Sequence, residues 1–204
     1  MKTFDMVSQK TTKFHHGNLR SALIDAATKL LDQEGDKGVT IRAVARAAGV
    51  SHAAPANHFH DRKALMTSLA AQFFEDLHIY IIEALKPKSG SAEDSIFSFA
   101  DALINYGLHY PERYQLLWRQ DLLNDDDPAL QKAMDGLYSH FTETIASFHT
   151  PVDYDLDTVS VALWSMCHGY VLMRLGGTFV PMQDKRTQTP RHKAIISSYL
   201  KSLN

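Results

Sequence analysis

The stretch TIRAVARAAGVSHAAPANHF, residues 40–59, decides the fold of this chain. Apolar residues in its first half recur at helical spacing, which predicts a short helix over 41–48 with one apolar face. Thr40 is expected to cap the start of this helix, and Gly49 to supply the left-handed turn that ends it. A second short helix over 52–58 follows, so the stretch reads as a helix-turn-helix whose second helix is shaped to enter the major groove of DNA.

Hydrophobic periodicity elsewhere predicts helices and no strand, so we expect an all-α protein of about nine helices. The helix that follows the motif is the longest, and at 1.5 Å per residue it spans roughly 36 Å, enough to link two lobes. The nine expected ranges are 17–34, 41–48, 52–58, 61–85, 91–109, 111–119, 128–148, 155–175 and 190–203.

Charge is unevenly distributed along the 204 residues. Residues 1–64 carry 10 Lys and Arg against 6 Asp and Glu, a formal +4, whereas residues 65–204 carry 11 against 17, a formal −6. The basic part suits a polyanion partner. The single cysteine, Cys167, excludes a disulfide within the chain, and neither a signal peptide nor a membrane span is evident, so we expect a cytoplasmic protein.

The residues around the motif carry a family resemblance. FHHGNLR at 14–20 precedes it and FHDRKAL at 59–65 ends it, and residues 14–75 together resemble the DNA-binding domain of the TetR family (TetR/AcrR-type) of bacterial transcriptional regulators. WSMCHG at 164–169 is similar to the Trp…His-Gly signature of one C-terminal subgroup. The resemblance implies a DNA-binding domain over 14–75 and a helical effector-binding and dimerisation domain over 76–204.

Four side chains of the second motif helix are expected to face base edges in the major groove: His52, Ala53, Asn57 and His58. Phosphate contacts are expected from Thr40, Arg42, Arg62 and Lys63. By position, the resemblance implies DNA contacts from His52, Ala56 and Arg62. The chain departs from the family pattern because Ala56 replaces an aromatic residue. Pro55 also lacks an N–H, so the opening turn of the helix is expected to be distorted.

Aromatic and sulfur-containing residues are dense in the C-terminal two thirds. Core packing explains most of them, but the resemblance implies that some line a cavity for a small apolar effector. We expect its lining to include Phe97, Leu103, Tyr106, Tyr114, Trp118, Tyr138, Trp164 and His168.

The last two helices are expected to form a homodimer, because the helix over 155–175 is apolar on nearly all sides and the final helix is amphipathic. The expected contact residues are Val159, Leu163, Val171, Ile195, Ile196, Tyr199 and Leu203.

No catalytic site, metal site or cofactor is expected. Cys167 and His168 are adjacent, so on a helix they point about 100° apart and cannot act on each other, and no nucleotide or metalloprotease motif occurs. Three classes of protein stay open: a ligand-gated regulator, a constitutive or architectural DNA-binding protein without an effector, and an enzyme or carrier that happens to contain a helical hairpin. The large acidic C-terminal part favours a regulator, most simply a repressor that a small apolar effector releases from a palindromic operator.

Overall fold

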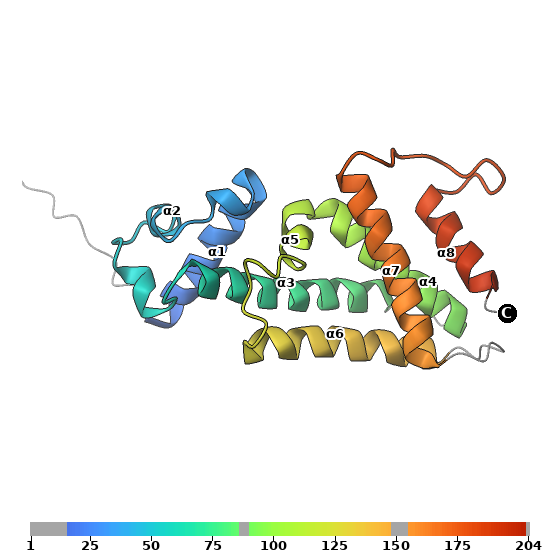
Figure 1. The fold of residues 1–204 in the computed structure, drawn as a ribbon, viewed down its shortest axis with the longest axis horizontal. Coiled ribbons are helices and arrows are strands. Elements are labelled where there is room, and N and C mark those ends of the chain that lie inside the picture. The colour runs from blue at the N-terminus through green and yellow to red at the C-terminus, as the bar shows by residue number, and fades with distance from the viewer. Residues whose placement is uncertain (1–15, 86–89, 148–154, 203–204) are drawn as a thin grey trace, which may run out of the picture.

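The computed structural model describes residues 16–85, 90–147 and 155–202, and the side chains of 16–18 lie outside that description. These residues form an elongated all-helical molecule (Figure 1). Its eight α-helices are α1 (His16–Glu34), α2 (Ile41–Ala47), α3 (Arg62–Leu85), α4 (Ala92–His109), α5 (Pro111–Leu116), α6 (Pro128–Ala146), α7 (Leu156–Leu175) and α8 (Arg191–Ser202). The 3₁₀ helices η1 (Asp36–Gly38) and η2 (Ala54–Asn57) complete the regular elements in this part of the chain.

The helix-turn-helix begins as predicted. The Thr40 hydroxyl accepts a hydrogen bond of 3.1 Å from the backbone N–H of Ala43 and so caps α2. Gly49 has a φ of 69°, in the left-handed region that glycine enters without strain. The N–H of Val50 then donates to the Ala45 carbonyl across 3.0 Å, which closes the end of the helix and reverses the chain.

The second helix of the motif differs from the prediction. In place of an α-helix over 52–58, the chain forms only the 3₁₀ turn η2. Pro55 has no N–H to donate to Ser51, and the neighbouring bonds span three residues, from Ala54 to the Ser51 carbonyl and from Ala56 to that of Ala53. The Pro55 carbonyl accepts from both His58 and Phe59, which ends the turn. Pro55 therefore shortens the element that was expected to read DNA.

The long helix α3 joins the two ends of the molecule. Asp61 caps it, because its carboxylate accepts from the Ala64 N–H at 2.7 Å. Figure 1 shows α1 and α2 at one end of α3, with α6 running along it and α7 crossing toward α8 at the other end. The helices α4, α6 and α7 pack on the C-terminal half of α3 or on one another, and α8 packs on α4.

Capping side chains fix the starts of the C-terminal helices. Ser91 and Asp94 form a reciprocal capping box at α4. Asp127 caps α6 and Asp155 caps α7. One continuous apolar core runs from Leu23 in α1 to Leu200 in α8, so both ends of the molecule share it. Within the described ranges, no helix has the length and apolar character that crossing a membrane requires.

Candidate functional site

The turn of the helix-turn-helix presents a polar and basic surface to solvent. His52, Ala53 and Asn57 are exposed, as is Ala56. His58 is half-buried, with its ring centroid 6.4 Å from that of Phe59. Arg42, Arg46 and Lys63 are also exposed beside this turn, and Arg46 is a cation that the expected phosphate set did not include. The sequence did indicate Arg46, because Arg42 and Arg46 lie four residues apart on α2 and therefore share a face.

Arg62 is engaged within the protein rather than free in solvent. Its Nε donates to the Val39 carbonyl at 2.7 Å, and one terminal nitrogen donates to the Asp36 carbonyl. These bonds tie the start of α3 to the loop that leads into α2. Arg62 therefore positions the helix-turn-helix, a role that its position in the sequence did not reveal.

An apolar pocket of about 280 Å³ opens between α3, α6, α7 and the segment that follows α5. Its floor is formed by Phe74 and Leu137, which are 2% and 1% exposed. Its rim includes Met134, Tyr138 and Val161, whose exposed fractions of 41%, 37% and 53% are high for apolar side chains. The remaining lining residues are Trp118, Asp135, Trp164 and Ser165.

Three of the eight expected effector residues line this pocket: Trp118, Tyr138 and Trp164. Leu103 and Tyr106 lie in the core, 0% and 2% exposed, and the Tyr106 hydroxyl donates to the Phe73 carbonyl at 3.3 Å. Phe97 packs against the core away from the lining. Met134, which the expected set did not include, lies at the pocket rim.

His168 and Tyr114 lie behind the pocket wall. The Tyr114 hydroxyl and His168 Nδ1 are 2.9 Å apart, and the His168 ring centroid lies 4.6 Å from that of Trp118. Burial lowers the pKa of His168, which favours the neutral ring. Trp118 in turn meets Trp164, with ring centroids 6.0 Å apart. Ring contacts therefore run without a break from the pocket to Tyr114 in α5.

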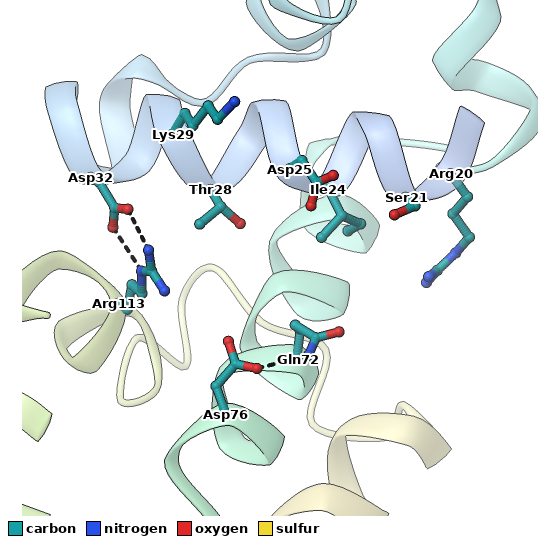
Figure 2. Close-up of a pocket in the computed structure, with 10 residues that line it drawn as sticks. All are labelled: Arg20, Ser21, Ile24, Asp25, Thr28, Lys29, Asp32, Gln72, Asp76 and Arg113. Atoms are coloured by element: carbon teal, nitrogen blue, oxygen red, sulfur yellow. Dashed lines mark hydrogen bonds and ion pairs between the residues drawn. The ribbon is translucent and has the colours of Figure 1, made fainter. Parts of the chain in front are cut away.

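A polar cleft of about 680 Å³ separates α1 from α3 and α5 (Figure 2). Across it, Arg113 in α5 forms a bidentate ion pair with Asp32 in α1, with N–O distances of 2.9 and 2.6 Å. The Arg113 guanidinium also lies 4.7 Å from the ring centroid of Tyr110. A second ion pair, Arg119 to Asp36 at 3.4 Å, joins the same segment to η1. The segment 111–119 thus contacts the helix-turn-helix end of the molecule, at α1 and η1, through two ion pairs.

The residues expected at a dimer contact lie mostly in the protomer's own core. Val159, Leu163, Val171 and Ile196 are at most 4% exposed, because α7 packs on α4 and α6 and α8 packs on α4. Ile195 and Tyr199 are half-buried, and Leu203 lies outside the described residues. The face of α7 that stays exposed is a different one, with Ala162, Ser165, Leu172 and Met173.

The described residues contain no group of three or more His, Cys, Asp or Glu side chains placed to hold a metal ion. Cys167 is buried, which raises the pKa of its thiol to about 12 and disfavours the reactive thiolate.

Known protein families match both the N-terminal and the C-terminal part of this chain. The family model described as bacterial regulatory proteins, tetR family, matches residues 23–69, and that of a tetracyclin repressor-like C-terminal domain matches residues 96–192. An uncharacterized HTH-type transcriptional regulator of Mycobacterium tuberculosis is 27% identical over 164 residues, covering 78% of this chain and 71% of that protein.

Two solved structures show how widely the fold is shared. A protein with unknown function from Rhodococcus sp. RHA1 superposes with a TM-score of 0.76 at 23% identity, covering 94% of this chain and 98% of that one. The regulator FadR from Bacillus subtilis, solved in complex with stearoyl-CoA, has a TM-score of 0.64 at 12% identity, with coverages of 90% and 97%. These likenesses extend over both ends of the molecule.

Proposed function

Because this chain belongs to the TetR family of bacterial transcriptional regulators, a class without enzymatic activity, we propose that it is a dimeric repressor that a small apolar effector releases from a palindromic operator. Three features support the proposal: the exposed turn at the N-terminal end, the pocket beside α6, and the segment that contacts both. The FadR relative is solved with stearoyl-CoA, so one protein of this fold holds a ligand with a long apolar chain.

The exposed turn carries the DNA-binding part of the proposal. Asn57 and His52 are assigned to base edges, where an amide suits adenine and a ring nitrogen suits a guanine acceptor. Arg42 and Lys63, with Arg46, are assigned to phosphates, which fix register and carry no sequence information. Because η2 is only one turn long, few side chains reach the groove, and each one bears a large share of the specificity.

The segment 111–119 is the single observation that carries the regulatory part. Trp118 lines the pocket, Tyr114 meets the ring of His168, and Arg113 and Arg119 hold Asp32 and Asp36 at the DNA-binding end. A ligand that displaces Trp118 would therefore also strain the two ion pairs that join this segment to α1 and η1. Such a ligand shifts the population only if it binds one arrangement more tightly than the other.

The exposed face of α7 is the surface we assign to the second protomer. Leu172 and Met173 are 42% and 40% exposed, unusual for apolar residues on a central helix. A Cβ added to Gly169 would meet no atom within 4 Å, so nothing in the protomer itself requires glycine there. A partner helix crossing at Gly169 would account for both features and would place two DNA-binding ends about a two-fold axis.

Selection of binding sites from a random DNA pool tests this function. The proposal expects one enriched sequence with two inverted half-sites whose centres lie about one helical turn apart. It expects the full-length protein to bind that sequence as a dimer. A pool that stays random after repeated rounds, with binding that depends only on salt, would favour the architectural class instead.

A further inference from the structure

We propose that the pocket beside α6 is built for a compact hydrophobic organic cation, such as an aryl quaternary ammonium compound. This inference rests on the proposed function, because it takes that pocket as the effector site. It goes further by specifying the charge of the ligand, which neither the fold nor the family determines.

The lining itself argues for positive charge. Of the nine lining residues, Asp135 is the single carboxylate, and none is Arg, Lys or His. No described residue forms an ion pair or side-chain hydrogen bond with Asp135, so its charge is not already neutralised by the protein. A carboxylate at the mouth of an otherwise apolar pocket would repel an anionic ligand and attract a cationic one.

The aromatic walls argue in the same direction. Trp118 and Trp164 both line the pocket, with their rings in an edge contact at an interplanar angle of 75°, and Tyr138 stands at the rim. The faces of such rings carry negative potential, and a cation within about 6 Å of them is attracted. A pocket lined by leucine or valine would bind a neutral ligand equally well. The indole and phenol rings beside a carboxylate therefore favour a cationic ligand.

The wider charge distribution reinforces the local one. Residues 65–204 carry a formal −6, and Asp125, Asp126 and Asp127 directly precede α6. Lys132, one turn before Asp135, is exposed and does not line the pocket. His168 lies behind Trp118, and burial lowers its pKa, so it adds little opposing charge near neutral pH. A cation therefore meets attraction on approach as well as in the pocket.

The test uses three probes of different charge, of which the cation and the neutral compound have nearly equal shape and the anion adds a carboxylate at the far end of the ring. They are trimethylphenylammonium, its neutral isostere tert-butylbenzene and the anion 4-tert-butylbenzoate. Binding to the full-length protein is measured by the fluorescence of Trp118 and Trp164, the two tryptophans of the chain, and by calorimetry. The key variant is Asp135→Asn, which keeps the shape of an exposed side chain and removes its charge. The matched control is Glu143→Gln, an equal loss of charge at an exposed position further along α6 that does not line the pocket.

We expect Asp135→Asn to weaken trimethylphenylammonium binding roughly five- to thirtyfold. Affinity for the neutral isostere should stay within about twofold, and affinity for the anion should rise. Glu143→Gln should change none of the three beyond a small general effect. Tyr138→Leu, at the exposed rim, should weaken the cation more than the neutral isostere.

The inference is overturned if Asp135→Asn affects cation and neutral isostere alike, or if no probe binds. Release of operator DNA, followed in the same samples, separates this result from the proposed function. Equal binding of all probes with DNA release would remove the charge preference and leave the regulator intact. Charge-dependent binding without DNA release would keep the cation site and remove the switch.

Discussion

At the scale of single residues, two adjacent basic side chains have different roles. Arg62 bonds to the carbonyls of Val39 and Asp36, whereas Lys63 is exposed. Position alone suggested phosphate contacts for both. The bonds of Arg62 instead suggest that it acts on DNA through the placement of α2, while Lys63 acts through charge.

Replacing each by alanine should therefore give distinct results. Arg62→Ala removes the side-chain donor from the Val39 carbonyl and one of two donors from the Asp36 carbonyl, which keeps the N–H of Val39, and should lower the free energy of unfolding by about 1–3 kcal/mol. It should weaken DNA binding without changing the slope of affinity against salt. Lys63→Ala should leave stability unchanged and reduce that slope by about one unit. Chemical denaturation and a salt series measure both, and a reduced slope for Arg62→Ala with normal stability would show that it contacts phosphate directly.

Asn57 and His52 should determine which sequence is bound. Alanine at either position should relax discrimination at one symmetric pair of operator positions and cost roughly 1–3 kcal/mol in affinity for the preferred site. Selection from random DNA with each variant gives the answer. A variant that still enriches the wild-type sequence would mean that these side chains do not read bases.

His78 and His140 connect α3 and α6, with ring nitrogens 3.0 Å apart, and we expect this contact to make stability depend on pH. Burial, and secondarily the neighbouring His140, lowers the pKa of His78 from its ordinary value of 6.5. Below about pH 6.5 the unfolded chain therefore binds a proton that folded His78 resists, so stability should fall as the pH drops through this window. Denaturant unfolding at pH 7.5 and 5.5 should show a smaller loss for His78→Gln than for the wild type, and equal losses would contradict the assignment.

At the scale of elements, local sequence rules predict where helices begin and end. They do not predict which face of a helix packs against the rest of the protein. Thr40 and Gly49 act where capping chemistry predicted, because each acts within a turn or so of one end of α2. The turn η2 differs from the expected helix because of Pro55, whose effect on the turn was foreseen but underestimated.

The candidate sites were less predictable because they depend on contacts between distant elements. Trp118, Tyr138 and Trp164 were expected in a pocket from aromatic density together with the family resemblance, and all three line one. Asp135 and Phe74 were missed, because nothing local marks them as facing one pocket. The exposed face of α7 was also missed, since a helix that is apolar on nearly all sides gives no sign of which side its own protomer covers.

Two glycines provide a direct test of the dimer surface. Gly169 in α7 and Gly136 in α6 both have open space where a Cβ would lie. A Cβ at either position meets no atom within 4 Å, and glutamine favours a helix over glycine by about 0.5–1 kcal/mol. We expect Gly169→Gln to sediment as a folded monomer and Gly136→Gln as a dimer. A dimeric Gly169→Gln variant would move the contact to another face.

At the scale of the whole molecule, the proposed regulation depends on communication across the cleft in Figure 2. Asp32 and Arg113 connect the two ends, and Trp118 and Tyr114 connect the same segment to the pocket. A contact path is only a spatial relation until binding at one end is shown to change affinity at the other. Because coupling between binding sites is reciprocal, it can be measured from either side.

The most direct measurement titrates the protein–operator complex with a panel of hydrophobic compounds, while tryptophan fluorescence and DNA anisotropy are followed together. The account predicts that compounds which quench Trp118 and Trp164 saturably also release DNA over the same concentrations. It also predicts that operator DNA weakens the binding of these compounds by the same factor by which they weaken DNA binding. Asp32→Asn breaks the ion pair with Arg113, so it should reduce this factor and preserve ligand affinity in the absence of DNA. Saturable quenching with unchanged operator affinity would contradict it.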